Sequence, residues 1–120
     1  MYNPMVVHSP LTESEVDRAF QALTDVTRRD ILRRTIQGGK SVSGLAMHYS
    51  MSFAAVQQHV AVLERAALVT KERRGREQIV HANWPTLGKV AALLDSYEQL
   101  WIARADQISE ILATEREEPE

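Results

Sequence analysis

The apolar residues of this chain change their spacing twice, and this change constrains the fold more than any other feature. Up to residue 67 they recur at three- and four-residue intervals, the period of amphipathic helices. The segment "LVTKERRGREQIVHAN" (residues 68–83) then has two short β-prone runs around Gly75, which is typical of a hairpin. From Trp84-Pro85 the helical period returns and continues almost to the C-terminus. The pattern predicts a mainly helical chain with one hairpin.

Four helices are predicted before the hairpin, each with a side chain that can cap its N-terminus. The first has the Thr-x-x-Glu pattern of a capping box. The second would end at Gly38-Gly39, because glycine adopts the backbone conformation that terminates a helix. The turn "HYSMS" separates the third helix from the fourth. The predicted capping residues are Thr12 with Glu15, Asp25, Ser43 and Ser52.

The second and fourth helices each have an apolar stripe that predicts which side chains are buried. In the second helix the stripe is short and is interrupted by arginines. In the fourth it runs the length of the helix, so that one face would pack and the opposite face would be exposed. The residues expected to be buried are Ile31, Leu32, Ile36, Val56, Val60, Leu63 and Ala67.

The hairpin has its charged residues at the bend. We predict a three-residue loop, Arg74-Gly75-Arg76, which places Arg73 opposite Glu77 and Lys71 opposite Ile79. This register pairs opposite charges across the strands, and opposite charges stabilise a sheet. We prefer it to a two-residue loop.

The last helix has an apolar seam whose steps alternate between three and four residues, the spacing of a coiled-coil stripe. Pro85 suits its first turn, where proline costs no hydrogen bond. Only Arg104 interrupts the seam. Its positions are Leu87, Val90, Leu94, Tyr97, Trp101, Arg104, Ile108 and Ile111.

The order helix, helix, helix-turn-helix, hairpin, helix predicts a winged helix-turn-helix. The fold class is mainly α with a small β-hairpin, that is, about five helices plus a two-stranded wing. We expect a loose arm over residues 1–11, one domain over 12–113 and an acidic tail over 114–120.

Composition narrows the class of function. The chain has 120 residues, a formal net charge of −2 and no cysteine, which excludes disulfides and thiolate metal sites. Its basic residues cluster in segments 28–40 and 71–76, so that a near-neutral total is compatible with a basic face. No apolar run approaches the ~20 residues that span a bilayer, and the N-terminus lacks the features of a signal peptide. We expect a cytoplasmic protein without a membrane partner.

The fourth helix, hereafter the reading helix, keeps its exposed N-terminal half free of charge. A major groove admits an α-helix, and glutamine can bond both polar groups of an adenine edge. Phosphates would repel acidic side chains, and within this helix none precedes Glu64. Phe53 either packs on the turn or contacts a base methyl. The predicted base-reading residues are Ser52, Ala54, Gln57 and Gln58, of which Ser52, like His59, is also placed to reach a phosphate.

Basic side chains on either side of the reading helix are candidates for contacts to the DNA backbone, which provide most of the sequence-independent affinity. The hairpin tip alone would be an ordinary charged turn, and its position one hairpin after the reading helix favours a role in binding. For the second helix, surface salt bridges to Asp25 or Asp30 are an equal alternative. The predicted backbone-contacting residues are His59, Arg73, Arg74, Arg76, Arg28 and Arg29.

Three segments together resemble the ArsR/SmtB family of bacterial repressors: "FQALTDVTRRDILRRTIQGG", "VSGLAMHYSMSFAAVQQHVAVLERAALV" and "KERRGREQIVHAN". The resemblance covers about residues 18–83, and the last helix is consistent in place and length. Val26 stands where the family usually has proline. The resemblance implies a homodimer, built from the first and last helices, that binds a palindromic operator. The expected interface residues are Phe20, Leu87, Val90, Leu94, Tyr97, Trp101 and Ile108.

The chain departs from the metal-sensing members of that family. Those carry a Cys-x-Cys-like pair on the third helix, or His and acidic ligands on the last. Here there is no cysteine, and the last helix has carboxylates but no histidine, whereas transition metals favour imidazole or thiolate. We therefore predict no metal site and no cofactor. Tyr97 and Trp101 could line a small-molecule pocket, although dimer packing explains them better, and any inducer is unknown.

The function predicted is that of a dimeric, sequence-specific transcriptional repressor, possibly an autorepressor, whose partners are double-stranded DNA and a second copy of itself. Two alternatives are a winged-helix module that binds protein rather than DNA, and a regulator that responds to a small molecule near Tyr97 and Trp101. The sequence has no Gly-rich phosphate loop, nucleophile-base pair or metal cluster, so we do not expect an enzyme.

Overall fold

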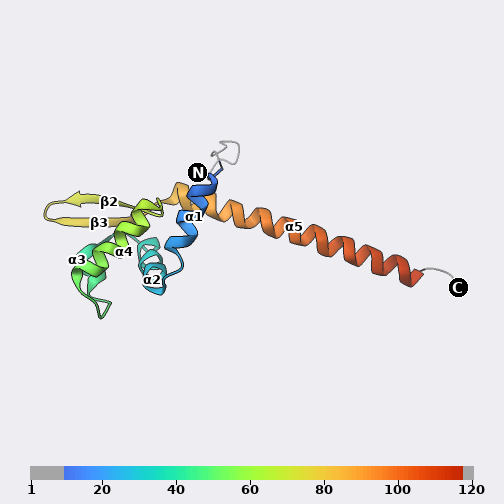
Figure 1. Cartoon of the computed structure of the whole chain (residues 1–120), viewed down its shortest axis with the longest axis horizontal. Helices are drawn as coiled ribbons and strands as arrows, with labels where there is room; N and C mark the ends of the chain where they lie inside the picture. Colours follow the sequence, from blue (N-terminus) through green and yellow to red (C-terminus); the bar gives the residue numbers. More distant parts are fainter. Residues whose placement is uncertain (1–9, 118–120) are drawn as a thin grey trace. The chain divides into compact units, whose positions relative to one another are not determined.

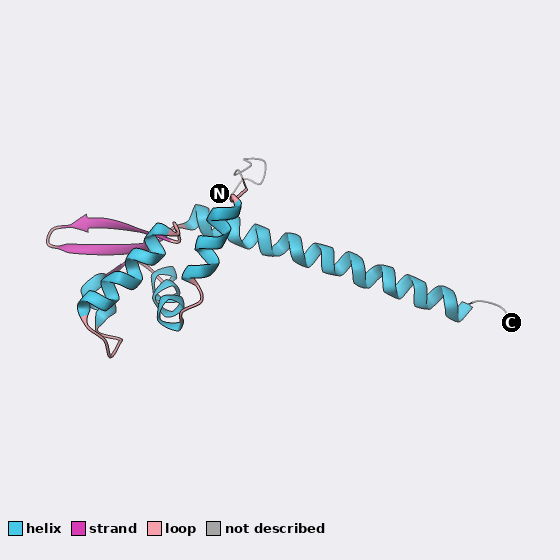
Figure 2. Cartoon of the chain, viewed as in Figure 1, coloured by secondary structure: helices cyan, strands magenta, loops and turns pink. Residues whose placement is uncertain are grey.

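A computed structural model describes residues 10–117, and the predicted residues 1–9 of the arm and 118–120 of the tail lie outside that range. The described part contains five helices and a small antiparallel sheet, which confirms the predicted fold class (Figures 1 and 2). The chain divides into two units, Met1–Lys89 and Val90–Glu120. The elements are α1 (Glu13–Ala22), α2 (Val26–Ile36), β1 (Lys40–Ser41), α3 (Val42–Ala46), α4 (Phe53–Arg65), β2 (Val69–Arg74), β3 (Glu77–Ala82) and α5 (Trp84–Glu117).

Three of the four predicted helix caps are present. Thr12 forms a complete capping box with Glu15 at the start of α1, and Asp25 accepts a hydrogen bond from the backbone N–H of Arg28 at 3.0 Å. Ser52 caps α4 by accepting from the N–H of Ala55 at 3.1 Å.

The predicted cap of α3 at Ser43 is wrong. Ser41 has that role, accepting from the N–H of Gly44 at 2.9 Å, because the helix begins two residues earlier, at Val42.

The sheet has a third strand that the sequence analysis did not predict. Its order is β1-β3-β2, and β1 contributes only Lys40 and Ser41, which pair with Val80 and Ile79. Two residues are too few to produce an alternating pattern. Gly39 permits this close approach, since a Cβ atom there would lie 2.7 Å from a ring carbon of His81.

The predicted register of the wing is also wrong. Arg74 lies opposite Glu77, and Arg73 lies opposite Gln78, so the loop contains two residues rather than three. Gly75 occupies the first loop position with φ 66°. A two-residue turn with glycine at its first position fits the twist of the flanking strands, and this turn chemistry decides the register.

The core of the first unit lies among α1, α2, α3, α4 and the base of the sheet. As predicted, Val56, Val60 and Leu63 form a buried stripe on α4. Ala67 is not part of it, because α4 ends at Arg65 and Ala67 adopts the left-handed conformation with φ 60°. Ile36 was also expected in the core but is 45% exposed in the last turn of α2.

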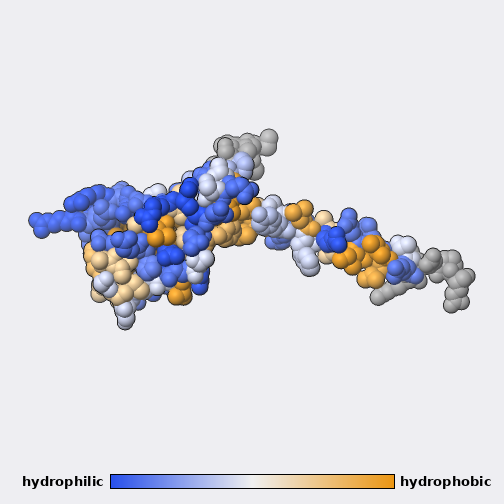
Figure 3. All heavy atoms as spheres, in the orientation of Figure 1, coloured by the Kyte–Doolittle hydropathy of each residue, from blue (hydrophilic) through white to orange (hydrophobic). Residues whose placement is uncertain are grey.

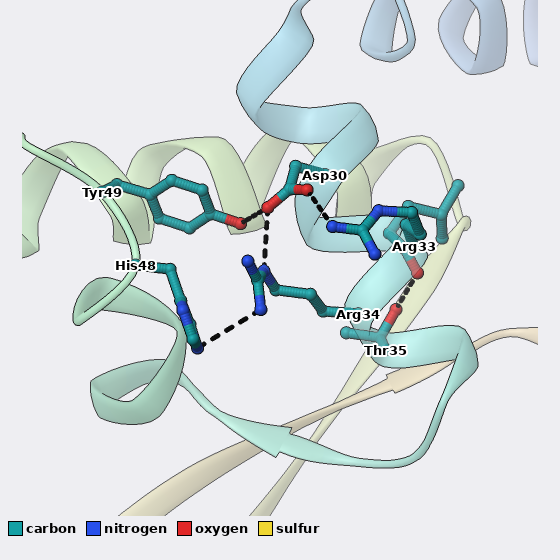
Figure 4. Close-up of polar contacts among 7 residues, drawn as sticks. Asp30, Arg33, Arg34, Thr35, His48 and Tyr49 are labelled. Atoms are coloured by element: carbon teal, nitrogen blue, oxygen red, sulfur yellow. Dashed lines mark hydrogen bonds and ion pairs between the residues drawn. The ribbon is translucent and has the colours of Figure 1, made fainter.

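A polar network ties α2 to the turn that precedes α4 (Figure 4). The Tyr49 hydroxyl donates to one carboxylate oxygen of Asp30 at 2.6 Å, and Arg34 Nε donates to the same oxygen at 2.8 Å. Arg33 donates to the other oxygen, and Arg34 Nη1 lies 3.4 Å from Nε2 of His48. Because His48 and Tyr49 belong to the turn, the network helps to determine where α4 begins.

The network shifts the pKa of both of its central groups. Hydrogen bonds from Tyr49, Arg34 and Arg33 hold the pKa of Asp30 well below its usual range. Burial, reinforced by the bond to Asp30, raises the pKa of Tyr49 to about 12. Asp30 therefore stabilises the fold above its unfolded pKa of 3.8, and this contribution is lost as the pH falls below that value. Tyr49 also stabilises the fold but has the opposite pH dependence: its contribution is present below pH 10 and is lost as the pH rises from 10 towards 12.

We predict that Asp30→Asn lowers the free energy of unfolding by about 1–3 kcal/mol at neutral pH, because hydrogen bonds to a charged group are lost. The difference from wild type should shrink as the pH falls below 3.8, where Asp30 of the unfolded chain is protonated. Urea unfolding followed by circular dichroism measures both effects. The control is Asp17→Asn, an exposed aspartate on α1, which should change stability by less than about 0.5 kcal/mol. Equal stability of Asp30→Asn and wild type would contradict this role.

Candidate nucleic-acid interface

The reading helix, α4, presents the four predicted base-reading residues on the outside of the first unit. Ser52, Ala54, Gln57 and Gln58 are all exposed. The Ser52 hydroxyl already accepts a hydrogen bond as the helix cap, so that only its proton and one lone pair remain for another partner. Burial of the opposite stripe turns the uncharged surface outward.

A cleft of about 340 Å³ separates this helix from the wing. On the helix side it is lined by Gln57 and by Phe53, and Phe53 is 47% exposed. On the wing side it is lined by Arg73 and Arg76. Four further polar or charged residues line the cleft and were not predicted from the sequence, because they come from three different segments; these are Ser43, Lys71, Glu77 and Gln78.

The cations of the wing differ in how they are paired. Arg74 lies 2.7 Å from Glu72, and Lys71 lies 3.2 Å from Glu64 of α4. Arg73 Nε donates to the carbonyl of Gly75 at 3.3 Å. Within residues 10–117, the ion pairs of the wing leave out Arg73 and Arg76. These two arginines line the cleft together with Glu77 and form no ion pair with a described residue, and the wing as a whole is hydrophilic (Figure 3).

Glu72 reduces the positive charge on the outer part of the wing. His81 Nε2 lies 3.1 Å from its carboxylate, on the opposite side of the hairpin from Lys71, Arg73 and Gln78 of the cleft. The hydrogen bond with His81 and the charge of Arg74 lower the pKa of Glu72, so that it stays ionised. Arg74 is therefore a weaker candidate for phosphate than Arg73 or Arg76, because its charge is already partly neutralised.

The other residues predicted to contact the DNA backbone, Arg28, Arg29 and His59, form hydrogen bonds within the protein. Arg28 Nε donates to the carbonyl of Ala22 at 2.7 Å, and Arg29 Nη1 donates to that of Leu23 at 2.6 Å. Arg28 Nη1 lies 3.2 Å from Nδ1 of His59. The two arginines thus satisfy carbonyls at the end of α1. Among the described residues, neither Arg28 nor Arg29 forms the alternative salt bridge to Asp25 or Asp30.

In the second unit, α5 carries most of the residues predicted to form a dimer interface. Leu94, Tyr97, Trp101 and Ile108 are between 48% and 70% exposed, and Figure 3 shows apolar patches along this helix. Of the other predicted residues, Val90 is buried, Leu87 is half-buried and Phe20 on α1 is 38% exposed. Large apolar side chains rarely stay uncovered on one face of a helix, so this surface is a candidate for a partner.

Among residues 10–117, no three His, Asp or Glu side chains come close enough together to hold a metal ion. None of the described helices combines the length and the apolar content that crossing a bilayer requires.

Curated and solved proteins similar to this chain are transcriptional regulators. The HTH-type transcriptional regulator Rv2034 of Mycobacterium tuberculosis is 34% identical over 99 residues, which cover 82% of this chain and 90% of the relative. The transcriptional repressor SdpR of Bacillus subtilis is 28% identical over 61 residues, or 51% of this chain and 68% of the repressor. No protein-family model matches the chain.

Solved structures agree with this similarity. An ArsR-like transcriptional regulator from Rhodococcus sp. RHA1 superposes with a TM-score of 0.70 at 32% identity, covering 82% of this chain and 92% of that one. A homodimeric winged helix-turn-helix DNA-binding domain from Mycobacterium bovis has a TM-score of 0.60 and 20% identity, with 77% and 91% covered, and supports the fold alone. The identity and coverage confirm the resemblance drawn from the sequence motifs: the chain belongs to the ArsR family of transcriptional regulators.

Proposed function

We propose that this protein is a dimeric, sequence-specific repressor that binds a palindromic operator in double-stranded DNA. The observation that carries the proposal is the uncharged, amide-bearing face of α4 beside a cleft whose wing side carries Arg73 and Arg76. Glutamine amides recognise base edges, whereas arginines bind phosphates of any sequence. Such a regulator acts where the DNA lies, so we expect it in the cytoplasm.

Dimerisation follows from the apolar face of α5 and from the relatives. A stripe that leaves Leu94, Tyr97 and Trp101 largely exposed requires a cover, and a second copy of the chain supplies an identical stripe. The Mycobacterium bovis relative is a homodimer, and the Bacillus subtilis relative is a repressor. Two reading helices related by a two-fold axis match a palindromic site whose halves lie about one helical turn, ~34 Å, apart.

A protein that blocks a promoter needs no cofactor, and we propose that this one acts without a metal. The last helix has no histidine and the chain has no cysteine, so the ligands preferred by transition metals are missing where metal-sensing relatives carry them. Whether the repressor controls its own gene is tested by including its own promoter among the DNA fragments. Absence of a salt-sensitive complex with any fragment would favour the protein-binding alternative.

Base reading by α4 predicts a loss of specificity in the glutamine variants. Gln57→Ala or Gln58→Ala should reduce discrimination against single-base changes in the operator by about 1–3 kcal/mol, the value of a bidentate base contact. The measurement is binding to a sequence selected from a random DNA pool and to its single-base variants. Gln37→Ala at the end of α2 is the matched control and should keep full discrimination.

Phosphate binding by the wing predicts a different change. Arg76→Ala should weaken binding to all sequences alike and reduce the slope of log K against log salt by about 0.9, the value for one phosphate contact. Arg18→Ala, which removes an exposed charge from α1, should leave the slope unchanged. If the glutamine and wing variants had the same effects on specificity and on slope, the division of roles would be wrong.

The proposed interface predicts that a carboxylate on the apolar face of α5 prevents dimerisation. Leu94→Glu or Trp101→Glu should give monomers by analytical ultracentrifugation, because dimerisation would bury an unpaired charge. The operator affinity of these monomers should fall steeply, because only one reading helix binds. Gln99→Glu introduces the same charge on the same helix away from the seam and should remain dimeric. Dimers of both apolar variants would place the interface elsewhere.

A further inference from the structure

The side chain of Arg28 joins three helices. Its guanidinium donates to the carbonyls of Ala22 and Gln21, the last two residues of α1, at 2.7 and 3.4 Å. Its third nitrogen lies 3.2 Å from Nδ1 of His59, near the middle of the reading helix. Arg28 itself belongs to the first turn of α2. One planar fork of donors thus connects α1, α2 and α4.

This contact determines which nitrogen of His59 carries the proton. Arginine donates hydrogen bonds and has no acceptor, so Nδ1 of His59 must accept from Arg28 and must be unprotonated. In the neutral ring the proton then resides on Nε2. The other candidate partner of Nδ1 is the carboxylate of Asp25, which lies 3.9 Å away, beyond hydrogen-bonding distance. Asp25 is engaged instead by the N–H of Arg28, which lowers its pKa.

Among residues 10–117, Nε2 of His59 has no hydrogen-bond partner, so we treat it as the atom that can bind a ligand. Within the described residues its ring is bonded through Nδ1, and no buried side-chain nitrogen or oxygen lacks a partner. Because Nε2 has no partner among the described residues, it is not fully buried and is at least partly accessible to solvent. The side chain as a whole is 22% exposed, so only its edge is accessible.

The place of His59 on α4 indicates what it contacts. At 100° per residue, Gln57 and His59 lie on opposite flanks of the exposed surface centred on Gln58. Gln57 faces the cleft and the wing. His59 faces away from the wing, towards Arg28 and the end of α1. The major groove is bordered by a sugar–phosphate backbone on each side. A helix docked in it would place the wing towards one backbone and His59 towards the other.

We propose that Arg28 is a positioning residue rather than a phosphate ligand: it holds His59 in the Nε2–H form, and that N–H donates to a phosphate on the groove wall opposite the wing. This inference rests on the proposed function for its DNA contact. The hold of Arg28 on His59 is a property of the free protein and is tested without DNA.

The first test measures the tautomer of His59 by long-range ¹H–¹⁵N NMR at about pH 8.5, where an ordinary histidine is neutral. The wild-type protein should show the Nε2–H form. Arg28→Lys keeps the charge but loses the planar fork, and should therefore shift His59 towards the Nδ1–H form, with Asp25 as the nearest acceptor. Arg29→Lys is the matched control, because Arg29 binds the carbonyl of Leu23 and should leave His59 unchanged. An Nδ1–H form in wild type, or no shift in Arg28→Lys, overturns the proposal.

The second test uses DNA. Arg28→Ala and His59→Asn should each weaken operator binding by about tenfold, the value of one hydrogen bond to a charged acceptor, with an unchanged salt slope. His59→Gln should bind more tightly than His59→Asn, because only the glutamine amide nitrogen extends to the position of Nε2. A salt slope reduced by about one in Arg28→Ala would make Arg28 a phosphate ligand and overturn the proposal.

The two tests separate the possible failures. Circular dichroism identifies any variant that does not fold. If Arg28→Ala does not fold, the NMR spectrum of Arg28→Lys still tests the proposal, because that change keeps the positive charge. If the wild-type protein binds no DNA, the proposed function and the phosphate contact both fail, while the NMR result still decides whether Arg28 selects the tautomer of His59.

Discussion

The burial of one stripe of α4 is the constraint on which the rest of the interface depends. Val56, Val60 and Leu63 are essentially inaccessible to solvent, and a helix whose one face is buried has no freedom to rotate about its axis. Gln57 and Gln58 are therefore exposed because other residues are buried. An uncharged polar surface has no packing function of its own, so its composition is free to suit a groove of DNA.

Two polar networks complete what apolar packing leaves undetermined. Packing fixes the rotation of α4, whereas its start is fixed through Tyr49 and Asp30 and its middle is held through His59 and Arg28. Hydrogen bonds are directional, so they define positions that non-directional apolar contacts leave loose. Both networks centre on α2, which thus acts as the support of the reading helix.

Two groups of arginines in the first unit differ in their surroundings. Arg28, Arg29, Arg33 and Arg34 are bound to carbonyls or to Asp30. Arg73 and Arg76 line the cleft outside the ion pairs of the wing. A formal net charge of −2 is therefore compatible with binding to a polyanion, because the field near the cleft depends on local, unpaired charge rather than on the total. Of the two acidic residues of the wing, Glu72 offsets the charge of Arg74, whereas Glu77 lines the cleft itself.

The sequence by itself determined the helices, three of the four predicted caps, the hairpin and the exposed face of α4, because these depend on residues within about four positions of one another. It also contained the family motifs. The tertiary structure decided the two-residue strand β1, the burial of residues at helix ends and the partners of the charged side chains. The sequence alone does not distinguish Arg28 from Arg76. In the structure, Arg28 is hydrogen-bonded to carbonyls and to a histidine, whereas Arg76 lines an open cleft. A guanidinium binds whichever acceptor lies within reach, and only the packing of distant segments determines which acceptor that is.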